Sequence, residues 1–168
     1  MGTFKDVERE EMEHFEEHLA TVEAAKKKES TDVTMDEEPT NESVAELTNR
    51  DAEWRKALRA SMKPKERTAI ERVKMPELDP VYRATTRTEE VNIGLTKEMA
   101  LTEAKRCLDC PKPSCMEGCP VNINIPSFVK NIERGQFLAA AKVLKNTSAL
   151  PAVCGRVCPQ EKQCESRC

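Results

Sequence analysis

The amino-acid sequence predicts a mainly α-helical protein whose ordered part lies toward the C-terminus. Between residues 96 and 146, apolar side chains recur at helical spacing, and Pro and Gly stand where helices begin and end. No segment shows the strict alternation that is typical of a half-buried strand. Because aromatic residues are 4% and charged residues 34% of the 168, we expect no large core across the full length.

Charge divides the chain into an acidic N-terminal extension and a mildly basic remainder. Residues 1–50 carry 6 basic and 15 acidic side chains, whereas residues 51–168 carry 21 and 15. One amphipathic helix is predicted over residues 4–28, and residues 26–43, almost without apolar side chains, are typical of a disordered tether. We therefore expect the extension 1–50 to be disordered or partly helical.

Residues 51–88 are predicted to form a helix followed by an extended arm. Three apolar side chains share one face of the helix: Trp54, Leu58 and Met62. Asn49 or Asp51 is expected to cap this helix, and Pro64 to end it. Later prolines and the lack of a sustained period indicate the arm. Its basic residues predict either a surface that docks on an acidic partner or on another domain, or else a solvated linker. They are Arg55, Lys56, Arg59, Lys63, Lys65, Arg67, Arg72 and Lys74.

Residues 89–168 are predicted to be the ordered domain, with helices joined by cysteine-bearing loops. Thr96 suits the N-cap of a helix that ends near the first cysteine. Pro126 suits the first turn of a second helix, and Gly135 its C-terminal break. A third helix is predicted over "QFLAAAKVLKN" from its apolar spacing.

Cysteine carries the strongest chemical signal in the sequence. All eight lie in the last 62 residues, in the patterns C-x2-C-x4-C-x3-C-P and C-x3-C-P-x4-C-x3-C. The N-terminus lacks the apolar region of a secretory signal, and the most apolar stretch, "FLAAAKVL", is too short to span a bilayer. The expected location is therefore the cytoplasm, where thiols stay reduced and dense cysteines bind metal or do redox chemistry.

The spacing predicts two [4Fe–4S] clusters. In the bacterial ferredoxin pattern, three closely spaced cysteines bind one cluster and the cysteine before proline binds the other. The first group here is that pattern with two extra residues, and the second group is its near mirror. Cluster one is predicted to use Cys107, Cys110, Cys115 and Cys168. Cluster two is predicted to use Cys119, Cys158 and Cys164, with Cys154 as a doubtful fourth ligand.

Other interpretations are weaker on the same residues. A closed zinc site usually pairs two C-x2-C hairpins, and only one occurs here. Disulfides do not suit a reducing compartment. "HFEEH" at residues 14–18 matches the H-x-x-E-H zinc-protease pattern, but no third ligand is visible, so a solvated helix face is favoured. The three lysines at 26–28 and the few aromatic residues do not indicate nucleic-acid binding.

The segments "RCLDC", "GCPVNINIPSF" and "LPAVCGRVCPQEKQCESRC" carry a family resemblance. The region of about 55–168 resembles the N-terminal iron–sulfur domain of the NADPH-dependent glutamate synthase small chain. The same module opens dihydropyrimidine dehydrogenase and related sulfide dehydrogenase or transhydrogenase subunits. The resemblance implies an α-helical ferredoxin-like fold that holds two [4Fe–4S] clusters. In such relatives the cysteine matching Cys154 is not a ligand, and a Gln or Glu beyond the last cysteine completes cluster two. Either Cys154 therefore substitutes for it, or cluster two is incomplete in this chain, and we expect Cys154 to be a buried free thiol in the full-length parent.

The resemblance also implies a redox function that needs other parts. In the family a domain that binds FAD and NADPH follows the last cysteine, and no G-x-G-x-x-G fingerprint for it occurs here. We therefore expect a piece of a longer oxidoreductase that is not catalytic alone. In the parent, its clusters would relay electrons from NADPH and FAD to a glutamate synthase large chain, where glutamine and 2-oxoglutarate form glutamate.

Overall fold

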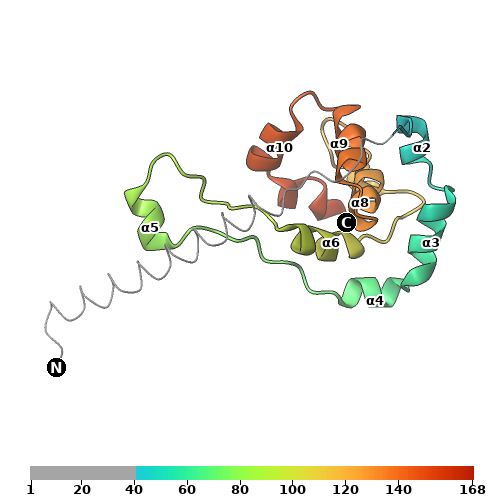
Figure 1. Cartoon of the computed structure of the whole chain (residues 1–168), viewed down its shortest axis with the longest axis horizontal. Helices are drawn as coiled ribbons and strands as arrows, with labels where there is room; N and C mark the ends of the chain where they lie inside the picture. The colour runs from blue at the N-terminus through green and yellow to red at the C-terminus, as the bar shows by residue number, and fades with distance from the viewer. Residues whose placement is uncertain (1–40) are drawn as a thin grey trace, which may run out of the picture. The chain divides into compact units, whose positions relative to one another are not determined.

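The computed structural model describes residues 41–168, which form two compact units (Figure 1). Residues 74–96 belong to one unit, and residues 41–73 and 97–168 to the other. The helix expected over residues 4–28, the H-x-x-E-H motif and nearly all of the expected tether lie outside the described residues. The domain boundaries expected after residues 50 and 88 stay predictions.

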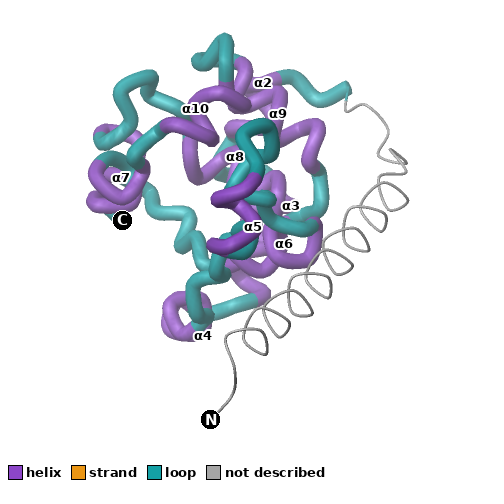
Figure 2. Tube along the Cα trace, turned by 90° about the vertical axis from the view of Figure 1, so that its left-hand side faces the viewer, coloured by secondary structure: helices purple, strands orange, loops and turns teal. Residues whose placement is uncertain are grey.

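The larger unit consists of helices joined by loops (Figure 2). Its α-helices are α2 (Val44–Thr48), α3 (Glu53–Ser61), α4 (Pro64–Ala69), α6 (Lys97–Lys105), α7 (Ser114–Glu117), α8 (Ile125–Glu133), α9 (Phe137–Lys145) and α10 (Pro151–Val157). Two 3₁₀ turns follow, η1 (Gln160–Lys162) and η2 (Glu165–Arg167). The fold is thus mainly α, as the sequence predicts, and the described residues contain no β-strand, only an isolated bridge. No helix among them is long and apolar enough to cross a membrane.

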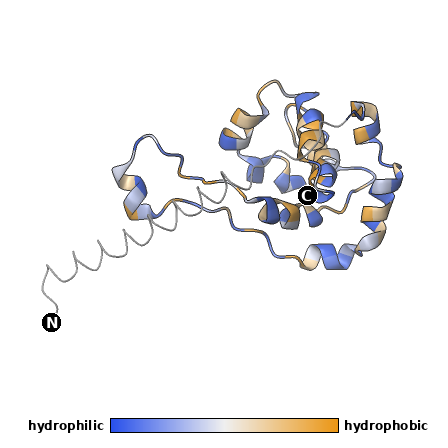
Figure 3. Cartoon of the chain, viewed as in Figure 1, coloured by the Kyte–Doolittle hydropathy of each residue, from blue (hydrophilic) through white to orange (hydrophobic). Residues whose placement is uncertain are grey.

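A small apolar core lies where α8 packs against α9 and α2 covers both (Figures 1 and 2). Leu47 of α2, together with Ala139 and Val143 of α9, is buried there, and Phe128 of α8 packs against them. Apolar residues gather on α8 and α9, whereas α4 is hydrophilic (Figure 3). Helix α6 packs on α8 and so brings the first cysteine loop to this centre.

Helix α8 ends as the sequence predicts. Gly135 adopts φ +83°, and its N–H donates to the Ile132 carbonyl at 2.8 Å. The Gln136 N–H donates to the Asn131 carbonyl at 2.9 Å. These two bonds make a Schellman motif, which satisfies carbonyls that the helix end would leave unpaired. The tight turn returns the chain as α9 alongside α8.

Two expectations for residues 49–69 are wrong. An extended arm is expected after Pro64, but Pro64 is the first residue of helix α4. Proline suits the first turn of a helix, and the Glu66 side chain accepts from the Lys63 N–H at 2.7 Å. Neither Asn49 nor Asp51 caps α3, whose N-cap is Ala52. The Asn49 side chain instead accepts from the Asp51 N–H at 2.9 Å, in a turn between α2 and α3.

In the smaller unit, residues 74–96 fold back on themselves. The Leu78 N–H donates to the Val91 carbonyl at 2.8 Å, and the Ile93 N–H donates to the Pro76 carbonyl at 2.9 Å. Between these paired segments lies α5 (Pro80–Thr85), which Asp79 caps by accepting from two backbone N–H groups. This part is therefore a paired loop with a short helix, and not a fully extended arm.

Candidate metal centre

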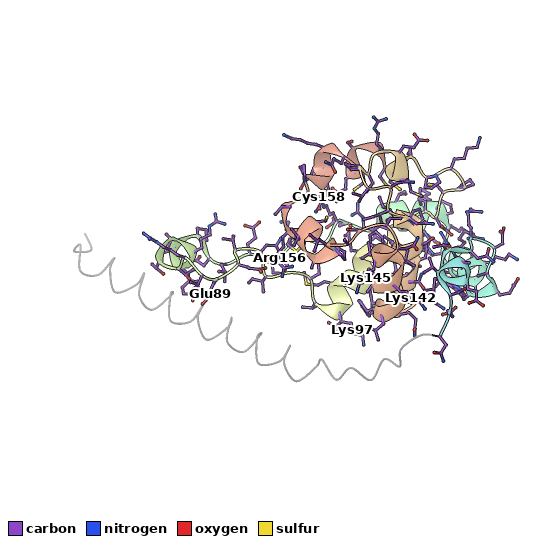
Figure 4. The ribbon with its side chains drawn as sticks, turned by 90° about the horizontal axis from the view of Figure 1, so that it is seen from above. Glu89, Lys97, Lys142, Lys145, Arg156 and Cys158 are labelled. Atoms are coloured by element: carbon purple, nitrogen blue, oxygen red, sulfur yellow. The ribbon has the colours of Figure 1, made fainter. Side chains whose placement is uncertain are left out.

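The eight cysteines lie in short helices or in the loops next to helices. Cys107 and Cys110 follow α6, Cys115 lies in α7, and Cys119 follows α7. Cys154 lies in α10 and Cys158 is its C-cap (Figure 4), while Cys164 and Cys168 flank η2. All eight thiols are free, and six are half-buried, the exceptions being the exposed Cys110 and Cys168.

The two cysteine groups meet although a helical hairpin separates them in sequence. Helix α7 packs against η2, and the Ser114 hydroxyl donates to the Arg167 carbonyl at 2.6 Å. At Gly118 the approach is so close that a Cβ atom would lie 2.8 Å from the Gln163 carbonyl oxygen. Residues 114–118 of the first group thus lie directly on residues 163–167 of the second.

Cys115 has the cysteines expected for cluster one as its electrostatic neighbours. Burial and the negative charges of Cys107, Cys168 and Cys110 raise the pKa of Cys115 to about 11, against the opposing effect of the Met116 N–H. Burial also raises the pKa of Cys107, although the Asp109 N–H and the Lys130 charge oppose this. Without metal these thiols stay protonated near neutral pH, so binding must displace protons.

A second neighbourhood surrounds Cys164. Burial raises the pKa of this thiol, and the charges of Cys119 and Cys158 raise it further. Cys158 also donates from Sγ to the Gln163 side-chain oxygen at 3.2 Å. Cys154 is in neither neighbourhood, and its Sγ lies 3.9 Å from the Ser148 hydroxyl. The assignment of these thiols to two clusters stays a prediction.

The candidate donors are all cysteine thiols. Among residues 41–168, the structure shows no group of three or more His, Cys, Asp or Glu side chains that could hold a metal ion. A four-iron cube takes one thiolate at each corner, so its ligands lie farther apart than those of one tetrahedral ion. Soft thiolates without imidazole or carboxylate among them favour iron–sulfur chemistry.

Asp109 fixes the loop between the first two cysteines. Its backbone is left-handed, with φ +54°, and its side chain is buried. Arg55 donates to both carboxylate oxygens at 2.6 and 3.0 Å, and Arg59 donates to one at 2.6 Å. Arg50 donates to the Asp109 carbonyl at 3.0 Å. Burial alone would raise the pKa of Asp109, but the hydrogen bonds and charges of Arg55 and Arg59 lower it, so the carboxylate is ionised.

A second buried group holds the other end of this loop. The Lys130 ammonium donates to the Cys107 carbonyl at 2.7 Å and to the Glu133 carboxylate. Arg67 also donates to Glu133, at 2.9 Å, and to the Lys105 carbonyl at 2.7 Å. Both Lys130 and Arg67 are buried. Side chains from α4 and α8 therefore grip the C-terminal end of α6 where it enters the cysteine loop.

These contacts correct the interpretation of the basic arm as a docking surface or a solvated linker for three of its eight basic residues. Arg55, Arg59 and Arg67 pair with Asp109 and Glu133 of the same unit. Arg72 and Glu165 form an exposed ion pair. The guanidinium carbon of Arg134 lies over the ring of Trp54, 4.0 Å from the centroid of that ring. Two features of the sequence belong to this ion-pair cluster: an Asp between two cysteines, and two Arg residues one helical turn apart. Nothing in the sequence indicates that the Asp and the two Arg residues lie together in the fold.

Gly118→Ala should loosen the contact between the two cysteine groups. The added Cβ would lie 2.8 Å from the Gln163 oxygen and 2.9 Å from Arg167 Cγ, so backbone must move. Overpacking of this kind costs about 1–3 kcal/mol. Gly155→Ala is the matched control, because nothing lies within 4 Å of its Cβ and alanine favours the helix. Urea unfolding measures both, and equal stability of the two variants would contradict the tight contact.

Known proteins resemble the cysteine-bearing part of the chain. A family model described as dihydropyrimidine dehydrogenase domain II, 4Fe–4S cluster, matches residues 83–168. The NADPH glutamate synthase small chain of Halomonas elongata is 38% identical over 93 residues, 55% of this chain and 20% of that protein. Its Escherichia coli counterpart is 40% identical over 79 residues, 47% and 17% of the two chains. The NAD-dependent dihydropyrimidine dehydrogenase subunit PreT of Escherichia coli is 39% identical over 80 residues, 48% and 19%. The chain thus spans about a fifth of the length of these relatives.

Proposed function

The chain belongs to the 4Fe–4S family of dihydropyrimidine dehydrogenase domain II, and from this premise we propose that it holds two [4Fe–4S] clusters and relays electrons in a glutamate synthase small chain. The packing of α7 against η2, which brings the two cysteine groups together, is the observation that carries the proposal. Such a domain has an α-helical ferredoxin-like fold. The family and its relatives support an iron–sulfur domain of an oxidoreductase, and the finer identity is our inference.

We assign the thiols as the spacing predicts. Cluster one takes Cys107, Cys110, Cys115 and Cys168, and cluster two takes Cys119, Cys158 and Cys164. Cys154 is assigned as a free thiol, since Ser148 is the neighbour that its sulfur contacts. When bound, each cluster supplies a centre that accepts and gives up one electron without proton transfer.

The chain's own residues hold and shield these centres. The contact of α7 with η2 brings Cys115 near Cys168, so one cluster joins both cysteine groups. Asp109 and Lys130 fix the backbone of the loop that carries Cys107 and Cys110. Half-burial of most of the thiols limits water near the sulfurs, which is one control on reduction potential.

In the parent protein, this domain would receive electrons from NADPH by way of FAD in a separate domain. It would pass them to a glutamate synthase large chain in the cytoplasm, for formation of glutamate from glutamine and 2-oxoglutarate. A second candidate is a subunit of the dihydropyrimidine dehydrogenase kind, because the PreT relative is as similar over this region as the glutamate synthase chains. Supplying each partner with the chain and a chemical reductant separates the two: one would form glutamate from glutamine and 2-oxoglutarate, and the other would reduce a pyrimidine.

Iron and acid-labile sulfide should be found in the anaerobically purified chain. About eight irons per chain would mean that a group of this chain completes cluster two beside Cys119, Cys158 and Cys164, whereas about four would mean that only cluster one is complete. Zinc without sulfide would contradict the electron-relay function and favour a structural zinc module.

Cys115→Ala should remove the iron of cluster one, about four atoms per chain, because the cluster would lose one of its four assigned thiolates. Cys154→Ala is the matched control and should keep the parent iron content and visible spectrum. Equal loss of iron from both variants would show that Cys154 is a ligand and that the assignment is wrong.

A further inference from the structure

Lys130 places its charged ammonium group on the buried side of α8, where an apolar residue is usual. Its side chain is 0% exposed, and it is the largest fully buried side chain among the described residues. Burying a charge costs free energy unless partners compensate for the lost water. Its two partners, the Cys107 carbonyl and the Glu133 carboxylate, therefore explain how the charge is tolerated.

The surroundings of Lys130 keep a surplus of positive charge at the cysteine loop. Glu133 neutralises only part of it, because this one carboxylate is shared by Lys130 and the buried Arg67. The Lys130 ammonium is also the group that touches the backbone of Cys107, at 2.7 Å. The positive charge therefore lies next to Cys107, one of the four residues proposed to hold cluster one.

Positive charge also exceeds negative charge around Asp109, the next charged residue along the cysteine loop. The buried carboxylate of Asp109 faces both Arg55 and Arg59, and Arg50 donates to the Asp109 carbonyl. Near cluster two the pattern differs. Between Cys158 and Cys164 the charged side chains are one acidic and one basic, Glu161 and Lys162, and both are exposed. Exposed charges are screened by water and salt, whereas buried ones are not.

We propose that Lys130 is a positioning residue that holds the Cys107 end of the loop and raises the reduction potential of cluster one above that of cluster two. This inference rests on the proposed function. Uptake of one electron adds one negative charge to a cluster and breaks no bond, so a nearby buried cation stabilises the reduced form. Hydrogen bonds and charge around the ligands are the levers by which a protein sets such a potential.

The test is a potentiometric titration of the anaerobically purified chain, followed by electron paramagnetic resonance. Cys115→Ala identifies the signal of cluster one by its loss. Lys130→Met should move that signal to a more negative midpoint potential and leave the signal of cluster two in place. Lys130→Arg, which keeps the charge, should restore the parent value. Lys145→Met is the control, because this lysine is exposed at the end of α9 (Figure 4).

Each remaining outcome decides the question. An unchanged midpoint in a Lys130→Met chain that holds its full iron would overturn the inference, as would an equal shift in Lys145→Met. If the Met variant fails to hold iron, Lys130→Gln repeats the comparison with a side chain that still donates to the Cys107 carbonyl. Loss of cluster one from both neutral variants would make Lys130 purely structural. A parent chain without iron and sulfide would instead refute the proposed function.

Discussion

Arg55→Met should lower the free energy of unfolding by about 3–5 kcal/mol, the usual cost of breaking a buried ion pair from one side. The Arg55 guanidinium forms a two-pronged contact with Asp109, and both side chains are almost fully buried. It also donates to the Ser127 hydroxyl at 2.8 Å and to the Thr48 carbonyl at 3.1 Å. After the substitution, Asp109 keeps only Arg59 as a cationic partner for its carboxylate. The midpoint of urea unfolding, followed by helical circular dichroism, should fall by about 2 M.

The neighbouring Lys56 supplies the control for this experiment. It pairs with Glu53 on the exposed side of the same helix, at 2.9 Å. Exposed pairs contribute about 0–1 kcal/mol, so Lys56→Met should scarcely change the midpoint. Arg55→Lys should fall between the two, because a lysine keeps the charge but not the planar fork. If Arg55→Met and Lys56→Met unfolded at the same urea concentration, the buried pair would not contribute to stability.

Glu133→Gln should destabilise the chain by at least a similar amount, about 3–5 kcal/mol, because it leaves two buried cations without their carboxylate. Lys130 and Arg67 both donate to Glu133, and all three side chains are nearly inaccessible. A glutamine can accept hydrogen bonds but carries no charge to balance them. Urea unfolding of the full chain measures the loss, and Glu77→Gln, which affects an exposed pair with Arg83, is the control.

A double variant makes this second prediction sharper. Lys130→Met in the Glu133→Gln background removes one of the two stranded cations. Groups in direct contact are not independent, so the double variant should lose less stability than the sum of the two single variants. Strict additivity would mean that Lys130 and Glu133 do not interact in the folded chain.

The periodic helices were predictable, and the short ones were not. Helices α3, α6, α8 and α9 have an apolar face long enough to show in the sequence, and Gly135 marks the end of α8. Helix α4 has only one turn or so, and its proline looks the same whether it begins a helix or ends one. Tertiary contacts decide such segments, and single residues do not encode those contacts.

The metal centre was predictable in one respect only. Cysteine spacing predicted an iron–sulfur domain, and the family match over residues 83–168 confirms that, whereas the assignment of each thiol to a cluster stays a prediction. The ion pairs around the loop could not be predicted, because Arg55 and Asp109 lie 54 residues apart and both are polar. Hydropathy patterns place such residues on the surface, whereas here each is buried by the presence of the other.

The arginines that grip the cysteine loop have a consequence for where this module can be cut or transplanted. Arg50, Arg55, Arg59 and Arg67 all precede the family match, which covers residues 83–168. A chimera that grafted only the matched segment onto another protein would carry Asp109 and Glu133 without these partners. The portable unit therefore includes α2, α3 and α4, and its donor boundary belongs before Ser43, the residue that caps α2.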